Sequence, residues 1–314
     1  MPKVRVNQDV ELFYESFGEG EPLLLIMGIG AQMVIWEDDF CRQLAARGFR
    51  VIRFDNRDVG HSTRLDQLRA PNMQRALRAR VLGKPIETAY TIDDMARDTF
   101  GLMDALGIES AHVVGLSLGG MIAQCMALLE PARVRSLGIL MSAPGELWAA
   151  IPRLTAMQSL MARPRSNARE DVLAHFVKVW KVLGAAPHRS PDARLHELAA
   201  LSYDRGRSGR GFARQFGAIM AAPPRSRRLR SLKVPTVVLH GAEDPLIPNL
   251  AGRVIAAQIP GARLSIIAGL GHELGPSAWS YTIDALEQNA HRKLGAHEKP
   301  LGMLRALTQR PTQI

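Results

Sequence analysis

Three polar residues whose types can act together in catalysis each come shortly after an apolar run. Ser117 follows HVVGL, Asp244 follows TVVLHGAE, and His272 follows RLSIIAGLG. A serine hydroxyl is a weak nucleophile unless a base such as imidazole accepts its proton and an acid orients that base. Residues of these types in the order serine, acid, histidine therefore predict a catalytic triad in which the serine attacks an acyl group.

The residues around Ser117 favour a nucleophile elbow, a sharp turn between a strand and a helix. Gly115 and Gly119 stand two residues before and after the serine, and apolar residues recur at helical spacing from Leu118 to Leu129. Such a turn strains the serine backbone and leaves room only for small neighbours. The alternative is a glycine-rich helix start at which Ser117 only caps the helix.

The acid and the base each have to be chosen among several candidates. Glu243 and Asp244 both follow the TVVLHG run; we favour Asp244 because a proline shapes the turn after it, and Glu243 stays open. His272 lies between glycines that let a loop carry its ring across the strand ends, whereas His291 and His297 lie in a basic stretch further on. Alone, each residue is better explained by local hydrogen bonds, but the combination favours a triad.

A developing oxyanion needs two backbone N–H donors. Leu118, directly after the serine, is one candidate, and Ile29, in the turn after LLLIMG, is the other. That turn, GIGAQM, also resembles a dinucleotide fingerprint, but Met33 replaces the third glycine and only Asp55 could serve as the ribose-binding acid. The sequence contains no Walker, H-E-x-x-H or C-x-x-C pattern, so we predict no cofactor and no metal.

The elements that must position these residues follow an alternating pattern of strands and helices. Continuous apolar runs of this length are typical of strands buried on both faces of a parallel sheet. The first twenty residues alternate instead and predict an antiparallel edge hairpin. We therefore expect an α/β fold with a doubly wound, mostly parallel sheet. Predicted strands cover 23–28, 50–55, 112–117, 134–141, 236–241 and 262–268, and predicted helices cover 38–47, 92–106, 118–129, 248–259 and 277–289.

One central segment interrupts this pattern and carries the excess charge. Residues 145–233 contain 17 Lys and Arg against 6 Asp and Glu, whereas the whole chain has a net charge of +10. The segment contains several prolines, favours helices and predicts no strand, so we interpret it as an Arg-rich helical cap. The core then comprises residues 1–144 and 234–290, and residues 291–314 form a basic C-terminal extension.

The basic segment could attract anionic substrates, a membrane surface or nucleic acid. We favour arginines on a solvated helical face or at a subunit contact, and no interleaving of aromatic and basic residues supports nucleic acid. Apolar residues at helical spacing between Leu147 and Ala162 predict packing within the cap and a lining for the substrate pocket. Arg64–Lys84 is expected to be a second basic loop on the same side.

The composition limits the classes of protein to which this chain can belong. The chain has 314 residues, of which 46% are hydrophobic, and its N-terminus lacks the apolar core of a signal peptide. Its longest nearly apolar stretch, residues 22–36, is too short to span a bilayer. The two cysteines, Cys41 and Cys125, fall in predicted helices and do not suggest a disulfide framework. We expect a soluble cytoplasmic protein without integral membrane association, and an oligomer is possible.

Several motifs together resemble the α/β-hydrolase family, over roughly residues 10–145 and 234–289. The IMG…W and FDNRDVGHST stretches in particular resemble its carboxylesterase branch, which includes aclacinomycin methylesterase-type enzymes. One departure is Met27-Gly28 at the oxyanion turn, where many relatives have His-Gly. The stretches that carry the resemblance are LLLIMGIGAQMVIW, GFRVIRFDNRDVGHST, HVVGLSLGGMIAQ, LHGAEDPLIP and GLGHELG.

The resemblance implies that Ser117 is the nucleophile, His272 its general base and Asp244 the residue that orients the base. It implies a cofactor-free serine hydrolase that cleaves small esters with an apolar part through an acyl-enzyme. A peroxide-dependent or carbon–carbon-cleaving enzyme of the same fold is one alternative, and a non-catalytic ligand-binding protein is another. A serine nucleophile disfavours epoxide hydrolases and haloalkane dehalogenases. The resemblance also implies that Asp58, His61 and Ser62 lie near the site and hold the loop beside it in shape.

Overall fold

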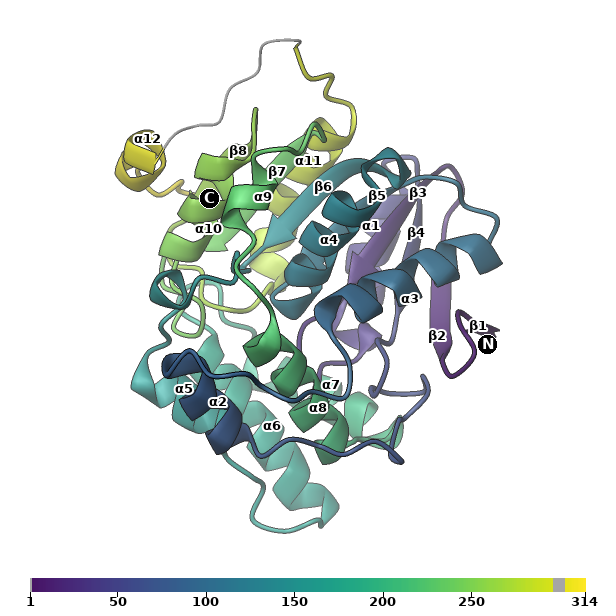
Figure 1. The fold of residues 1–314 in the computed structure, drawn as a ribbon, viewed down its shortest axis with the longest axis vertical. Coiled ribbons are helices and arrows are strands. Elements are labelled where there is room, and N and C mark those ends of the chain that lie inside the picture. Colours follow the sequence, from purple (N-terminus) through teal and green to yellow (C-terminus); the bar gives the residue numbers. More distant parts are fainter. Residues whose placement is uncertain (1, 296–302) are drawn as a thin grey trace.

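An eight-stranded sheet forms the centre of the computed structural model, which describes residues 2–295 and 303–314 (Figure 1). Its order is β1-β2-β4-β3-β5-β6-β7-β8, and every pair from β4 to β8 is parallel. β1 and β2 pair with each other, and β2 with β4, antiparallel. This confirms the expected mostly parallel sheet. The strands are β1 (Lys3–Arg5), β2 (Glu11–Phe17), β3 (Glu21–Ile26), β4 (Phe49–Phe54), β5 (Ala111–Leu116), β6 (Val134–Leu140), β7 (Thr236–Gly241) and β8 (Arg263–Ile267).

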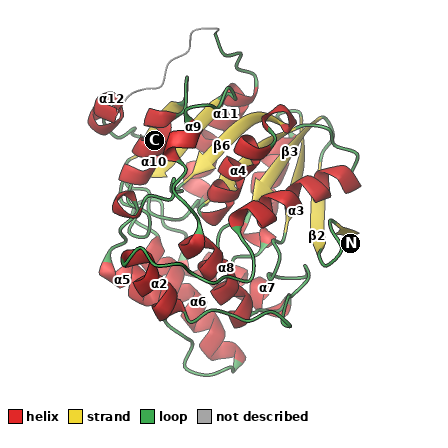
Figure 2. Ribbon diagram, viewed as in Figure 1, coloured by secondary structure: helices red, strands yellow, loops and turns green. Residues whose placement is uncertain are grey.

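Helices cover both faces of the sheet (Figure 2). In β3, Leu24 and Ile26 belong to the hydrophobic cluster on one face, and Leu23 and Leu25 to the cluster on the other. Strands buried on both faces require apolar residues at consecutive positions, which explains the continuous runs in the sequence. The first face is covered by α3 (Ile92–Ala105), α4 (Leu118–Leu129) and α10 (Leu250–Gln258), and the second by α1 (Asp38–Ala45) and α11 (Trp279–Ala290).

Residues 145–221 fold mostly as helices beyond one end of the sheet, in the lower part of Figure 1, whereas α9 (Ser226–Leu229) packs against α4 and α10 beside the sheet. The segment 145–233 contacts three loops of the core. Gln215 accepts a hydrogen bond from the Gly30 amide after β3, and Arg205 donates to Asp55 after β4. The Leu183 carbonyl accepts a hydrogen bond from the His272 amide after β8. These loops leave the carboxyl ends of the strands. The helices are α5 (Leu154–Met161), α6 (Arg169–Leu183), α7 (Asp192–Asp204), α8 (Gly209–Ala221) and α9 (Ser226–Leu229).

The stretch Arg64–Lys84 is not entirely a loop, contrary to expectation, because it contains helix α2 (Met73–Val81). The Asn72 side chain accepts a hydrogen bond from the amide of Arg75 and so caps the first turn. The helix packs against α8, which belongs to a distant part of the sequence. A helix this short depends on such tertiary packing, which local sequence does not specify.

The C-terminal residues return to the sheet edge. Thr312 forms a bridge with Ile267 at the end of β8, and its carbonyl accepts a hydrogen bond of 2.9 Å from the Ala268 amide. The preceding helix α12 (Met303–Thr308) packs against α10. Residues 296–302, part of the basic extension and including His297, lie outside the described residues.

Cys41 and Cys125 are free, buried thiols, and burial raises the pKa of each to about 12. Neither is therefore a reactive thiolate at neutral pH. Among the helices of the described residues, none combines the length and apolar character needed to cross a membrane.

Candidate active site

Ser117 lies on a strained turn between β5 and α4. Its φ of 57° and ψ of −118° are in a region that residues with a Cβ rarely adopt. The flanking glycines are required sterically. A Cβ on Gly115 would lie 2.1 Å from the Gly119 carbonyl oxygen, and a Cβ on Gly119 would lie 2.0 Å from the Ile26 carbonyl oxygen. The serine thus sits where strand, helix and β3 approach too closely for larger residues.

Hydrogen bonds hold this strained turn in place. The Ser117 amide donates to the Leu140 carbonyl at the end of β6 over 2.9 Å. The hydroxyl of Ser142 donates to the Ser117 carbonyl over 2.7 Å. The backbone of the serine is therefore anchored to the neighbouring strand on both sides of its Cα, which leaves only its side chain to rotate.

Asp244 contacts His272 directly. Its Oδ2 lies 2.6 Å from Nδ1 of His272, and its Oδ1 accepts hydrogen bonds from the amides of Leu246 and Ile247 at 2.9 and 2.8 Å. Burial alone would raise the pKa of Asp244, but His272 and His240 beside it hold the pKa well below its usual range. A buried carboxylate that stays ionised can orient the imidazole and stabilise its protonated form.

Among the described residues, Glu243 forms no hydrogen bond or ion pair with His272. Its side chain is exposed and forms no hydrogen bond or ion pair in the described part of the chain. Its amide donates to the Leu270 carbonyl, which turns the carboxylate of the next residue, Asp244, toward the histidine loop.

A second histidine lies against the same carboxylate and was not predicted from the sequence. His240, on β7, is fully buried, with Nε2 2.7 Å from the Ile247 carbonyl oxygen and 3.4 Å from Asp244 Oδ2. Its only sequence signal is a polar residue inside the apolar run TVVLHG. In this position it packs under the turn that carries Asp244 and helps to fix it.

Residues of the segment 145–233 hold the loop that carries His272. The sequence did not predict these contacts. The His272 amide donates to the Leu183 carbonyl over 2.8 Å, and the amide of Ser190 donates to Oε1 of Glu273 over 3.2 Å. A Cβ on Gly271 would lie 2.4 Å from the Leu183 carbonyl oxygen. Burial raises the pKa of Glu273. The residues between α6 and α7 thus form one wall of the histidine loop.

The turn after β3 lies beside the serine. A Cβ on Gly28 would lie 3.2 Å from the Ser117 Cβ. Within the described residues, the backbone amides of Ile29 and Leu118 donate no hydrogen bond, whereas the amide of Gly30 donates to Oε1 of Gln215. Two unengaged donors therefore flank the serine turn.

All three predicted triad residues follow parallel strands and therefore lie at one edge of the sheet. Ser117 follows β5, and Asp244 and His272 follow β7 and β8. The structure joins Asp244 to His272. It has no hydrogen bond between the Ser117 hydroxyl and the His272 ring within the residues it describes.

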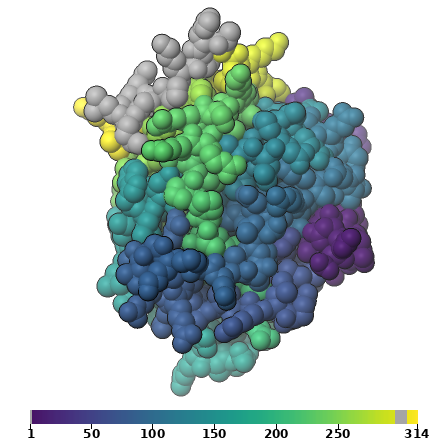
Figure 3. Space-filling view, in the orientation of Figure 1, coloured from purple at the N-terminus to yellow at the C-terminus, as the bar shows by residue number. Residues whose placement is uncertain are grey.

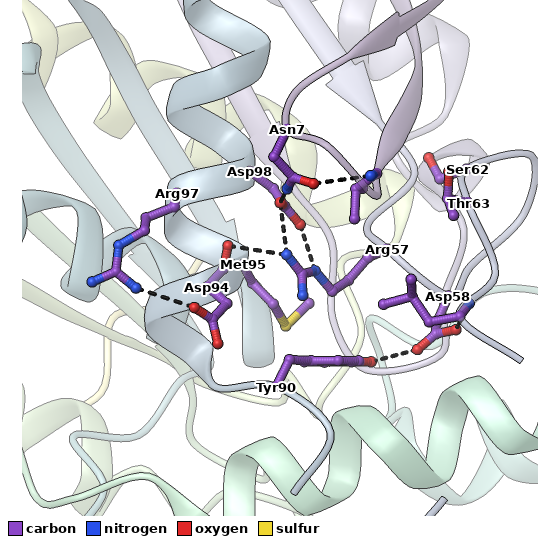
Figure 4. A network of polar contacts seen from close by, with 12 residues as sticks. Asn7, Arg57, Asp58, Ser62, Thr63, Tyr90, Asp94, Met95, Arg97 and Asp98 are labelled. Carbon is purple, nitrogen blue, oxygen red and sulfur yellow. Dashed lines mark hydrogen bonds and ion pairs between the residues drawn. The ribbon is translucent and has the colours of Figure 1, made fainter. Parts of the chain in front are cut away.

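The loop after β4 is held by buried ion pairs. Asp58 has a positive φ of 71°, and its carboxylate accepts hydrogen bonds from the Leu65 amide and the Tyr90 hydroxyl. Next to it, Arg57 pairs with Asp98, as Figure 4 shows. The Ser62 hydroxyl donates to the Asp55 carbonyl, and His61 donates through its amide to the Asp55 side chain. These contacts agree with a loop-shaping role for Asp58, His61 and Ser62.

Arginines of the helical segment reach into this loop. Arg214 is fully buried and bonds both carboxylate oxygens of Asp58, at 2.6 and 2.8 Å. Arg205 bonds Asp55, whose other oxygen accepts the Met33 amide. The expectation of a solvated arginine face is therefore wrong for Arg205 and Arg214, because core carboxylates 150 or more residues away pair with them.

Comparison with known proteins identifies the fold family of the chain. A family model described as alpha/beta hydrolase fold matches residues 21–276. The rhodomycin D methylesterase of Streptomyces sp. strain C5 is 31% identical over 300 residues, which cover 87% of this chain and 93% of the relative. The Streptomyces peucetius rhodomycin D methylesterase is 29% identical, covering 85% and 91%.

Solved structures share the same fold. The enol-lactonase from Burkholderia xenovorans LB400 superposes with a TM-score of 0.69, at 22% identity, over 93% of this chain and all of its own. At that identity the likeness concerns the fold alone. The family match covers most of the chain, and so do the alignments with the two methylesterases. The chain therefore belongs to the α/β-hydrolase fold family, and its methylesterase relatives support a hydrolase activity.

Proposed function

We propose that this protein hydrolyses carboxylic esters with Ser117 as nucleophile, His272 as general base and Asp244 as the residue that orients the base. The observation that carries the proposal is the 2.6 Å contact between His272 and the buried Asp244, at the sheet edge where the strained Ser117 also stands. A charged acid bound to one ring nitrogen leaves the other nitrogen free to accept a proton.

The proposed reaction is acyl transfer in two stages. Oγ of Ser117 attacks the ester carbonyl carbon while Nε2 of His272 takes its proton, and the amides of Ile29 and Leu118 stabilise the oxyanion. The C–O bond to the alcohol then breaks, and His272 returns the proton to the departing oxygen. His272 then takes a proton from water as the water oxygen attacks the acyl carbon. The bond from that carbon to Oγ of Ser117 breaks, His272 gives the proton to Oγ, and the acid and the free serine are released.

The proposed substrate is a small ester with an apolar part. Two methylesterases among the relatives support an ester whose alcohol is small. The ring of Phe212 fits against Gly30 in the proposed oxyanion turn. The departure at Met27 does not contribute, because that side chain is buried in a core cluster. Apolar side chains at this place favour binding of a hydrocarbon portion. We also propose that residues 145–233 act as the cap over this site.

The test is hydrolysis of p-nitrophenyl acetate, butyrate and octanoate by wild type and Ser117→Ala. We expect kcat to fall at least about a thousandfold in the variant, because the nucleophile is lost. The matched control is Ser110→Ala, since Ser110 lies before β5, at the opposite end of that strand, and bonds Arg135. An organophosphonate should label Ser117 in wild type, as seen by peptide mass spectrometry.

Two outcomes would overturn the proposal. Unchanged hydrolysis in Ser117→Ala would remove this serine from the reaction. Absence of both turnover and labelling in the wild type would favour a ligand-binding protein that keeps the fold without the activity.

A further inference from the structure

The exposed apolar side chains of this protein are concentrated in two short segments. Six of the nine large hydrophobic residues that are exposed in the described part of the chain lie there, including Trp148 at 55% exposure and Leu154 at 71%. The predicted packing of the Leu147–Ala162 stripe is wrong for Leu147, Ile151 and Leu154, which are exposed, whereas Leu160 of the same stripe packs against the core. The six residues are Val81, Leu82, Leu147, Trp148, Ile151 and Leu154. Single exposed hydrophobic residues are ordinary, but a group of this kind marks an interaction site.

The two segments adjoin in space. Nη2 of Arg80, at the end of α2, donates to the Gly145 carbonyl over 2.5 Å, two residues before Leu147. Figure 3 shows the α2 region, in dark blue, exposed on the molecular surface. The Arg153 amide donates to the Pro245 carbonyl, directly after Asp244. The apolar residues thus belong to one surface beside the candidate site.

This surface is basic throughout. Residues 73–84 and 147–165 contain no Asp or Glu. None of their basic residues forms an ion pair within the described residues, whereas Arg169, Lys181 and Arg194, further along the same chain, all do. The seven unpaired basic residues are Arg75, Arg78, Arg80, Lys84, Arg153, Arg163 and Arg165. We call these seven and the six apolar residues the docking surface.

We propose that the docking surface binds an anionic lipid bilayer in a peripheral, reversible manner. Exposed Trp and Leu side chains enter the headgroup region, and surrounding Arg and Lys attract anionic lipids. On α2, Arg75, Arg78 and Leu82 are exposed at spacings of three and four residues and so lie along one stripe.

Two other occupants fit the observations less well. A second copy docked through the same surface would bring seven unpaired basic residues against seven of the same sign, which costs free energy. Nucleic acid would meet the positive charge but leave aliphatic residues such as Ile151 and Leu154 in contact with polar phosphates. A bilayer satisfies both the charge and the apolar centre.

The test measures binding to vesicles and not activity, so it is independent of the proposed function. The full chain is sedimented with sucrose-loaded vesicles of phosphatidylcholine that contain either no phosphatidylglycerol or about 30% of it. We expect binding only to the anionic vesicles. Binding should be lost in about 1 M NaCl, because the Debye length there is only about 3 Å and the charges are screened. Ser117→Ala should bind like wild type.

Variants separate charge from apolar insertion. Arg75→Glu with Arg78→Glu should lower the partition coefficient more than about tenfold, because each basic residue near an anionic surface contributes about fivefold. Trp148→Ser with Leu154→Ser should also weaken binding and remove the blue shift of tryptophan emission. The matched control, Arg227→Glu with Arg263→Glu, makes the same charge change at exposed residues on α9 and β8 and should bind normally.

Three results would overturn the proposal. The first is equal binding to neutral and anionic vesicles, or to neither. The second is an equal loss of binding in the control variant, which would indicate a net-charge effect without a specific surface. The third is a concentration-dependent dimer of wild type that Trp148→Ser with Leu154→Ser dissociates, which would assign the surface to a second copy.

Discussion

Two sets of arginines in the same helical segment have opposite environments. Arg205 and Arg214 point into the protein, where they pair with Asp55 and Asp58. Arg153, Arg163 and Arg165 are exposed and form no ion pair in the described residues. The count of basic residues, which made this segment stand out in the sequence, therefore combines two unrelated uses of one residue type.

The inward set ties the proposed cap to the loops beside the candidate site. A buried guanidinium and a buried carboxylate each lose hydration, and only their mutual hydrogen bonds offset that cost. Removing one partner leaves the other charge unpaired and buried. The outward set has no such dependence, because water solvates each exposed arginine. The two sets should therefore differ sharply in stability and in surface binding.

Arg214→Ala should lower the free energy of unfolding more than Gly271→Ala or Arg163→Ala. It leaves the buried Asp58 without its bidentate partner, so we expect the free energy of unfolding to fall by about 3–5 kcal/mol. Urea unfolding at pH 7 (about 25 °C), followed by circular dichroism, measures the change. A loss below about 1 kcal/mol would show that the pair does not anchor the segment.

Gly271→Ala should have an intermediate effect on stability. It changes the contact between the histidine loop and Leu183. The new Cβ would meet the Leu183 carbonyl at 2.4 Å, so the histidine loop or the residues after α6 must shift. We expect a loss of about 1–3 kcal/mol in stability and a lower kcat in ester hydrolysis. The control is Gly209→Ala in α8, where a Cβ meets nothing within 4 Å and should not destabilise. Equal kcat for the two variants would contradict the proposed importance of this wall.

The buried Arg214–Asp58 ion pair should also make the free energy of unfolding depend on pH. Burial would raise the pKa of Asp58, but hydrogen bonds from Arg214, the Leu65 amide and Tyr90 lower it overall from its usual 3.8. Because the folded pKa is lower, this stabilisation is complete above the unfolded pKa and is lost as pH falls through the folded one. In Arg214→Ala, burial dominates and raises the folded pKa above the unfolded one, so the sign reverses and the contribution of Asp58 to stability rises as pH falls through the folded pKa. Unfolding free energies measured from pH 7 down to about 3 for both proteins test the direction.

Arg163→Ala should have the smallest effect on stability. The side chain is exposed and unpaired, so the free energy of unfolding should change by less than about 0.5 kcal/mol. The same urea measurement checks it. A loss comparable to that of Arg214→Ala would remove the distinction between the two sets of arginines.

Much of the fold and the candidate site could be predicted because their signals are local. A strand buried on both faces needs consecutive apolar residues, and the elbow needs small residues at Gly115 and Gly119. These requirements act within a few residues of each other. The positions of Ser117, Asp244 and His272 after strands then imply one sheet edge, because parallel strands all end on the same side.

The missed residues depend on contacts between distant parts of the chain. His240 gains its place under Asp244 only when the turn after β7 folds back over it. Leu183 meets the amide of His272 only when the segment between α6 and α7 packs on the loop. No local periodicity encodes such pairings.

By itself, the sequence determined most of the strands and helices of the core, though not helix α2, and which residues could perform acyl transfer. Only the tertiary structure decided which arginines pair with buried carboxylates, and that the apolar stripe near Trp148 remains uncovered. The reason is physical. Apolar spacing and charge are properties of one segment, whereas burial is a property of whatever packs against it, and Arg214 and Asp58 are 156 residues apart in the chain.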